Sequence, residues 1–163
     1  MPIHIDPTAK VSASADIEDS VHGTMIKIGA EAVVDSFVKI KPAGGTGDVT
    51  VGARTVINSG CVIYTGHGVT IGDDVAVAAN CVFAATNHAY KDKDRLIREQ
   101  RFLPSRGGII VEDDVWIGAG VILLDGAIVR QGAVIGAGSL VRGEVPAYAV
   151  ATGNPLSVRS WRR

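Results

Sequence analysis

A six-residue spacing of apolar side chains runs through this chain and constrains its fold more than any other feature. Within each of six groups, positions six residues apart carry Ile, Val, Leu or Phe: Ile5, Val11, Ile17; Ile28, Val34, Ile40; Val51, Ile57, Ile63; Ile71, Val77, Phe83; Val111, Ile117, Leu123; and Val129, Ile135, Val141. Four residues after each, the side chain is nearly always small or β-branched. Two inward positions in every six residues indicate a short strand followed by a corner.

The interruptions of this spacing indicate how the strands are arranged. Extra residues follow the third position of each of the first four groups, and none separates Leu123 from Val129. Three six-residue sides make an 18-residue triangular coil, and every insertion then leaves from the same corner. We therefore predict an all-β parallel helix of about six stacked coils, with backbone ladders about 4.8 Å apart. An ordinary β-sandwich, which also has many short strands, does not explain the fixed spacing.

Length and charge limit the remaining choices. The 163 residues suit one domain. We expect a β-helix domain over residues 1–145 and a tail, 146–163, that packs on or extends from the last coil. The formal net charge of −1 gives no general attraction to nucleic acid or an anionic membrane. No apolar run approaches the ~18 residues of a membrane span, and the N-terminus has no export-signal pattern, so we expect a cytoplasmic protein without a transmembrane segment.

Several stretches carry a resemblance to a known family. The repeats IGAEAV, VGARTV, IGDDVA, IGAGVI and IGAGSL, together with NHAY, RGGIIVEDDVWIGAG and VPAYAVATGNP, resemble the hexapeptide-repeat acyltransferases. The match from residue 87 onward is similar to the branch of galactoside, maltose, polysaccharide and streptogramin acetyltransferases. This resemblance implies a left-handed β-helix, acetyl-CoA as donor and a sugar acceptor. It also implies a homotrimer with active sites between subunits.

The largest insertion identifies a candidate catalytic residue. It adds 22 residues to the corner between Phe83 and Val111, about 87–108, and so long a loop in a compact domain is usually functional. His88 lies at its start. Transfer of an acetyl group from a thioester to a hydroxyl needs a base for the hydroxyl proton, and neutral imidazole suits that task. The resemblance matches Thr86-Asn87-His88 to the family's general-base motif, so we predict His88 as the base. An inert surface histidine is the alternative.

Three further residues are candidates for binding the acceptor. Asn80 and Asn87 are expected to flank the same edge and to hydrogen-bond acceptor hydroxyls or the carbonyl oxygen. Asn also tolerates left-handed corner conformations, which would explain Asn80 without a ligand. His67 lies at the same corner as His88, one coil earlier, and is interpreted as lining the acceptor pocket or supporting His88. A solvated corner residue is its alternative.

Charge and resemblance together suggest where coenzyme A binds. Residues 87–108 carry six basic and three acidic side chains, and residues 142–163 carry four and one, so each segment has a net charge of +3 and the rest of the chain −7. Basic segments suit the phosphates of coenzyme A, for which Arg142 is a candidate. The resemblance implies that the pantetheine arm lies along the late coils, beside Trp116 and the backbone of Ala119 and Ala137.

Other chemistries fit less well. Cys61 and Cys81 occupy inward positions on neighbouring coils, and buried thiols are poor nucleophiles. A γ-carbonic-anhydrase-like zinc site needs three histidines, whereas only His67 and His88 lie near one corner, so no metal is expected. A non-catalytic β-helix leaves the long insertion unexplained. The family resemblance therefore implies an O-acetyltransferase of lipopolysaccharide or other cell-surface polysaccharide biosynthesis, with N-acetylation of an amino sugar as the main alternative.

Overall fold

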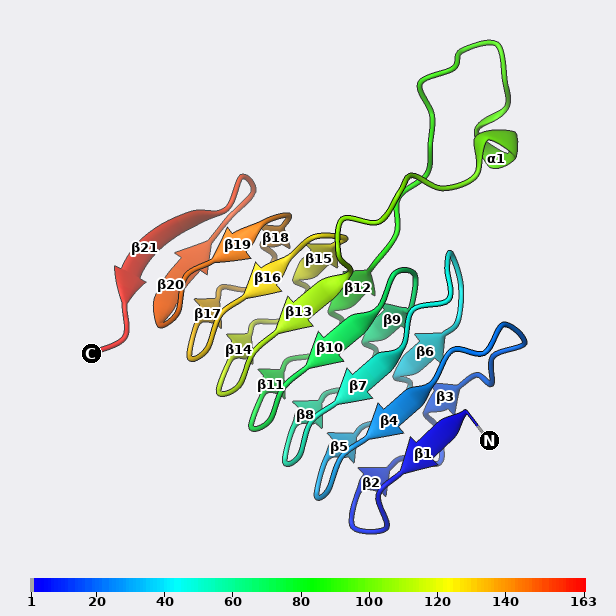
Figure 1. Ribbon diagram of the computed structural model, residues 1–163. Coiled ribbons are helices and arrows are strands. Elements are labelled where there is room, and N and C mark those ends of the chain that lie inside the picture. The colour runs from blue at the N-terminus through cyan, green and yellow to red at the C-terminus, as the bar shows by residue number, and fades with distance from the viewer. Residues whose placement is uncertain (1) are drawn as a thin grey trace.

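Three parallel sheets form the three sides of a prism in the computed structural model, which describes residues 2–163 (Figure 1). Each coil contributes one short strand to each side in turn. Sheet A has the order β1 (Ile3–Ile5), β4 (Ile26–Ile28), β7 (Val49–Val51), β10 (Val69–Ile71), β13 (Ile109–Val111), β16 (Ile128–Val129) and β19 (Glu144–Val145).

The other two sheets repeat this arrangement. Sheet B has the order β2 (Lys10–Val11), β5 (Val33–Val34), β8 (Val56–Ile57), β11 (Ala76–Val77), β14 (Trp116–Ile117), β17 (Val134–Ile135), β20 (Ala149–Thr152) and β21 (Ser157–Trp161). Sheet C contains β3 (Asp16–Ile17), β6 (Lys39–Lys41), β9 (Val62–Tyr64), β12 (Val82–Ala84), β15 (Ile122–Leu124) and β18 (Leu140–Val141). The all-β prediction is confirmed.

The register of the strands places the repeated apolar residues above one another. Val51 pairs with Ile28 on one side and Ile71 on the other, and Ile71 pairs with Val111. The same side chains are buried from the second coil onward, and the inward residues four positions later, such as Val38 and Val121, join them in one core. The long run of stacked Ile and Val side chains therefore stabilises the whole prism through apolar burial.

The C-terminal segment extends the stack. Val145 pairs with Val129, and Ala151 pairs with Ile135, so β19 and β20 form two sides of a partial seventh coil. The sixth coil, from Val129 to Val145, is two residues shorter than the 18-residue coil from Val111 to Val129, which is why the six-residue frame misses the seventh. Strand β21 then folds back antiparallel on β20 and forms the last strand of sheet B.

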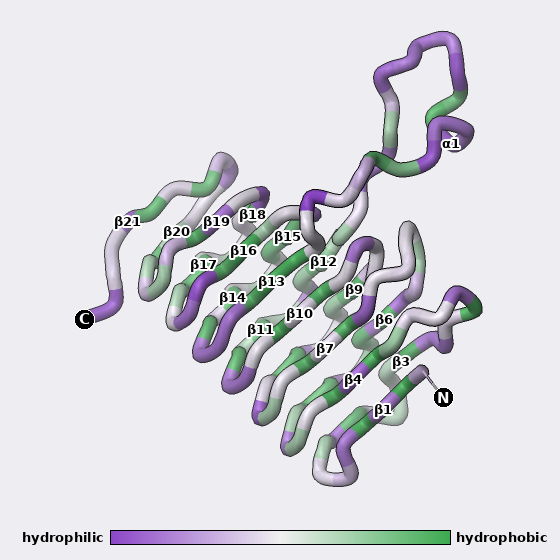
Figure 2. The backbone as a smooth tube through the Cα atoms, in the orientation of Figure 1, coloured by the Kyte–Doolittle hydropathy of each residue, from purple (hydrophilic) through white to green (hydrophobic). Residues whose placement is uncertain are grey.

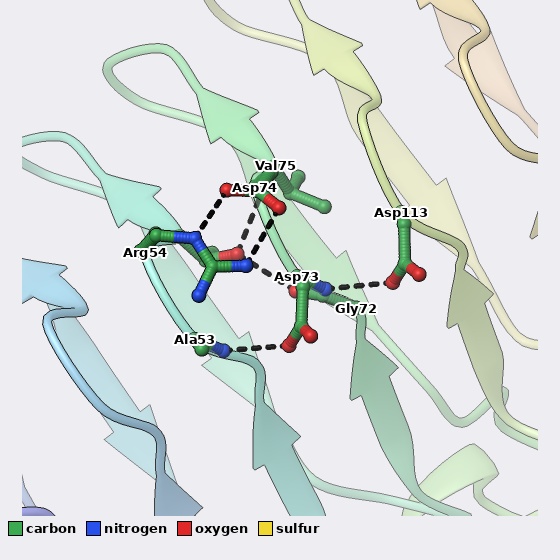
Figure 3. A network of polar contacts seen from close by, with 8 residues as sticks. Ala53, Arg54, Gly72, Asp73, Asp74, Val75 and Asp113 are labelled. Atoms are coloured by element: carbon green, nitrogen blue, oxygen red, sulfur yellow. Dashed lines mark hydrogen bonds and ion pairs between the residues drawn. The ribbon is translucent and has the colours of Figure 1, made fainter.

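Left-handed residues make the tight corners. Glu31, Arg54, Asp74 and Asp114 have φ between 56° and 57° at the corner from sheet A to sheet B. Figure 3 shows how polar groups join successive coils there: Arg54 donates two hydrogen bonds to Asp74, of 2.7 and 2.8 Å. The Oδ1 atom of Asp113 accepts a bond of 2.8 Å from the backbone N–H of Asp73. These bonds satisfy corner groups that the sheets leave unpaired.

One segment departs from the prism. Between β12 and β13 the chain leaves the stack, forms the short helix α1 (Ile97–Gln100) and returns (Figure 1). We call residues 87–108 the arm. Figure 2 shows that the arm is mostly hydrophilic, in contrast to the green stretches that recur along the coils. None of the helices in residues 2–163 has the length and apolar character that crossing a bilayer requires.

Candidate active site

The arm is anchored where it leaves and re-enters the prism. Near its start, the Thr86 hydroxyl donates a hydrogen bond of 3.2 Å to the carbonyl of Gly44. At its end, the Asp125 carboxylate accepts bonds of 2.9 Å from the backbone N–H of Arg106 and 2.8 Å from that of Gly108. Gly126 also donates to the Gly108 carbonyl, at 2.6 Å. Asp125 is buried, so these bonds fix the returning strand against the next coil.

The two halves of the arm pair with each other near the prism. The Leu103 N–H donates to the Asn87 carbonyl at 2.8 Å, and the Ala89 N–H donates to the Arg101 carbonyl at 2.9 Å. His88 and Phe102 form an isolated antiparallel bridge, and their rings lie 4.7 Å apart between centroids, tilted by 40°. The imidazole is therefore positioned by contact with an aromatic ring and by the short ladder on either side of it.

A cavity of about 780 Å³ lies between the arm and the late coils. Its lining residues come from both: Asn87, His88, Tyr90, Leu103, Arg106, Leu124, Asp125, Arg142 and Gly143. The volume is in the range of small-molecule sites, and a titratable imidazole lies on the wall. The structure thus brings together three of the predicted site residues, Asn87, His88 and Arg142.

Asn80 lies at a different corner from these residues. Asn80 precedes β12, whereas Asn87 follows it, so a whole side of the prism separates them. The expectation that they flank the same edge is wrong for a single chain. Asn80 has φ of 60° and occupies the corner from sheet B to sheet C, where Gly60 and Gly120 are also left-handed. Its conformation explains the choice of Asn at that corner.

Three predicted coenzyme A contacts, Ala119, Ala137 and Trp116, lie at or next to the same corner as Asn80. The Gly138 N–H donates to the Ala119 carbonyl at 2.8 Å, and Ala137 follows one coil above Ala119 at the same corner. Trp116, on the adjoining side β14, has 56% of its surface exposed. A single chain therefore presents two groups of candidate residues, one at the corner of the arm and one at the corner between sheets B and C.

His67 lies beneath the arm rather than in the cavity. Its backbone N–H donates to the Ala85 carbonyl at 2.9 Å, one residue before Thr86. It is not among the residues that line the cavity, and its Nε2 atom is buried without a hydrogen-bond partner in residues 2–163. Within one chain, His67 therefore contacts the segment that leads into the arm and does not line this cavity.

The two cysteines are part of the core, as predicted. Both are free and buried, and their thiols donate to backbone carbonyls, Cys61 to Ala78 at 3.1 Å and Cys81 to Gly118 at 3.2 Å. Contact with the Cys81 thiol, together with burial, raises the pKa of Cys61. Both side chains are fully buried, so neither thiol is accessible as an acyl-accepting nucleophile.

Sequence reasoning missed several cavity residues, of which Arg106 and Asp125 are the most informative. Asp125 occupies the corner position at which the two preceding coils have Thr65 and Ala85, so a charged residue at a buried position was the available signal. Arg106 was counted only as part of the arm's net charge. In the described residues, no group of three or more His, Cys, Asp or Glu side chains is placed to hold a metal ion.

Comparison with known proteins identifies the family. The family description "Bacterial transferase hexapeptide (six repeats)" matches residues 108–143, and "Hexapeptide repeat of succinyl-transferase" matches residues 48–84. A Schizosaccharomyces pombe protein that carries an acetyltransferase name is 32% identical over 86% of this chain and 70% of its own length. The chain belongs to the hexapeptide-repeat acetyltransferase family, and its fold is the left-handed parallel β-helix of that family.

Two further similarities concern the branch and the ligand. The galactoside O-acetyltransferase of Escherichia coli is 32% identical over 68% of this chain, which spans 53% of that enzyme. The crystal structure of a hexapeptide-repeat acetyltransferase of Vibrio cholerae, complexed with acetyl-CoA, superposes with a TM-score of 0.73 at 28% identity. The superposition covers 83% of this chain and 71% of the other.

Proposed function

We propose that the protein transfers an acetyl group from acetyl-CoA to a hydroxyl of a sugar destined for a cell-surface polysaccharide or lipopolysaccharide. The observation that carries this proposal is the position of His88, which lies on the wall of the cavity between the arm and the late coils. The kinship with a sugar O-acetyltransferase and with an acetyl-CoA complex supports the donor and the acceptor class.

The proposed reaction is a direct transfer. Neutral His88 accepts the proton of the acceptor hydroxyl while its oxygen attacks the thioester carbonyl carbon. The resulting tetrahedral intermediate carries a negative oxygen, which a hydrogen-bond donor such as the Asn87 amide stabilises. When the intermediate collapses, the carbon–sulfur bond breaks and the imidazolium returns the proton to the thiolate of coenzyme A. No covalent acyl-enzyme is formed, in agreement with the burial of both cysteines.

The division of the candidate residues between two corners supports a site shared by neighbouring subunits. We infer a homotrimer in which the corner with Asn80, Ala119 and Ala137 of one subunit faces the arm of the next. The pantetheine chain would then lie along Trp116 and the late coils of one subunit and reach His88 of the other. Closed rotational symmetry is the usual arrangement for such subunits.

The base is tested by replacing His88 with Ala. We expect acetyl transfer to fall by about 10²- to 10⁴-fold, because only proton transfer is lost. Free thiol release from acetyl-CoA, with a panel of sugars and amino sugars as acceptors, measures the rate and separates O- from N-acetylation. His22→Ala, an exposed histidine on an early corner loop, is the matched control. Near-normal turnover in His88→Ala would remove His88 from the mechanism.

The shared site has its own test. His88→Ala and Ala137→Trp should each lose most of their activity, the second because the new ring blocks the groove for pantetheine. If one subunit supplies the base and its neighbour the groove, trimers assembled from a mixture of the two variants regain activity. A monomer in sedimentation, or mixed trimers that stay inactive, would contradict the arrangement.

A further inference from the structure

Two guanidinium groups line the cavity beside His88 and have no assigned role together. Arg106 comes from the returning half of the arm, and Arg142 follows β18 on the last complete coil. None of the ion pairs found in residues 2–163 involves Arg106 or Arg142; the cations that form them are Lys39, Lys41, Arg54, Lys93, Arg130 and Arg162. Both arginines are exposed, so the cavity has two positive groups without an anionic partner.

The backbone places Arg106 on this wall. Its N–H is held by Asp125 at 2.9 Å, and its side chain lies across Gly126, where an added Cβ would come within 3.0 Å of the Arg106 Cβ and 3.6 Å of its Cδ. The bare glycine lets the aliphatic part of Arg106 lie against the corner. Gly143 lies one coil further along, where its carbonyl accepts a hydrogen bond from Ile128, so Arg142 lies on the coil next to that of Gly126.

The one acidic residue that lines the cavity does not neutralise these groups. Asp125 is 2% exposed, and its two carboxylate oxygens each accept a backbone N–H, from Arg106 and from Gly108. No ion pair joins it to either guanidinium. Asp125 thus holds the backbone of Arg106 in place while leaving the guanidinium free for a ligand.

We propose that Arg106 and Arg142 form an anion subsite for the acceptor, which then carries a phosphoryl group in addition to the hydroxyl that is acetylated. This inference rests on the proposed function. Guanidinium groups bind phosphate through paired charge-assisted hydrogen bonds. Two guanidinium groups on successive coils can therefore donate to one phosphoryl group from two sides. Arg106 belongs to the same arm as His88, so a phosphate bound there fixes the acceptor hydroxyl relative to the base.

Binding measurements test the subsite without depending on catalysis. With protein saturated by coenzyme A, isothermal titration compares glucose 6-phosphate and glucose 1-phosphate with glucose. We expect at least tenfold tighter binding of one or both phosphates, and loss of that difference in Arg106→Gln and Arg142→Gln. Lys93→Gln removes the same charge from an exposed site on the same arm, so it should bind as the unaltered protein does. Equal binding of phosphorylated and neutral sugar overturns the proposal.

Coenzyme A also carries phosphates, and a second comparison separates the two sources. If the arginines bind the acceptor, both variants keep the affinity for coenzyme A and for its 3′-dephospho form. If the variants weaken coenzyme A but not its dephospho form, the subsite belongs to the donor and the proposal is wrong. Phosphate-dependent binding by a protein that transfers no acetyl group would support the subsite and contradict the proposed function instead.

Discussion

The coil stack and the arm are stabilised by different interactions. In the stack, every side of every coil repeats the same inward apolar pattern, and each strand is paired with the strand of the next coil. In the arm, residues 91–99 are all exposed, and order comes from a short ladder at the base, from a few hydrogen bonds to corner residues and from local bonds of the Gln100 side chain. The stack therefore holds its shape through burial, whereas the arm depends on its anchors.

This difference explains where the chemistry lies. A surface of repeated short strands offers no deep cleft by itself, and the cavity with His88 exists because the arm stands over the late coils. Long insertions at a corner cost little free energy when the flanking strands stay paired. The stack can thus carry a functional segment without losing its own stability, and the two regions should respond separately to mutation.

The strongest test removes the arm. Deleting residues 86–107 leaves Gly108 at the corner position that Gly126 occupies in the next coil and restores an 18-residue coil. We expect the β-sheet circular dichroism and cooperative unfolding to remain, while acetyl transfer and the His88 cavity are lost completely. Loss of the folded state would show that the arm and the stack are not independent.

A core truncation should have the reverse effect. Phe83 is the largest fully buried side chain, and it lies on β12 directly before the arm. Phe83→Ala should lower the free energy of unfolding by about 3–5 kcal/mol, because it removes buried apolar surface and leaves a cavity. Urea denaturation measures the change. If the free energy of unfolding fell by less than about 1 kcal/mol, neighbouring side chains would have filled the space left by the ring. The core would then be less closely packed than the burial indicates.

An anchor of the arm should affect activity more than stability. Asp125→Ala leaves two backbone N–H groups without their acceptor and should lower the free energy of unfolding by about 1–3 kcal/mol. With Arg106 released, we expect the KM for the acceptor to rise and trypsin to cleave faster at the arm's Lys and Arg residues. Asp113→Ala, which breaks a similar bond to Asp73 at a distant corner, should change stability without changing either readout. Equal KM values in both variants would contradict the anchoring role.

The smallest effect concerns an acidic residue of the stack. Hydrogen bonds from Arg130 and from the Gln131 N–H lower the pKa of Glu112 below its usual value. A carboxylate with a lowered pKa in the folded state contributes stability above its unfolded pKa and loses it as the pH falls through the folded pKa. Stability should therefore decline less steeply from pH 5 to pH 3 in Glu112→Gln than in the unaltered protein, as thermal unfolding would show. An unchanged slope would contradict this.

Much of the fold follows from spacing alone. The repeated positions predicted the three-sided coil, the common corner of the insertions and the buried cysteines, because a period of six with two inward residues has few solutions. The partial seventh coil was missed, since two missing residues shift Val145 and Ala151 out of the frame. Handedness came from the family resemblance, because spacing is the same for either hand.

The candidate site was harder to predict. His88 was found because it opens a long insertion, and Asn87 because it is adjacent to His88. Asn80 was predicted to lie at the same edge as Asn87. This was wrong, because Asn80 precedes β12 and therefore lies at another corner. Arg106 carried no signal of its own, because its position depends on how the arm returns across Gly126.

The amino-acid sequence by itself determined the prism, since local spacing decides which side chains face inward and each coil needs only its neighbours to bury them. Tertiary structure alone decided the cavity, in which residues from Asn87 to Gly143 meet through the path of one exposed arm. That path is set by hydrogen bonds between residues 17 to 42 positions apart, which Gly108 donates to Asp125 and Thr86 donates to Gly44, and no short-range pattern encodes them.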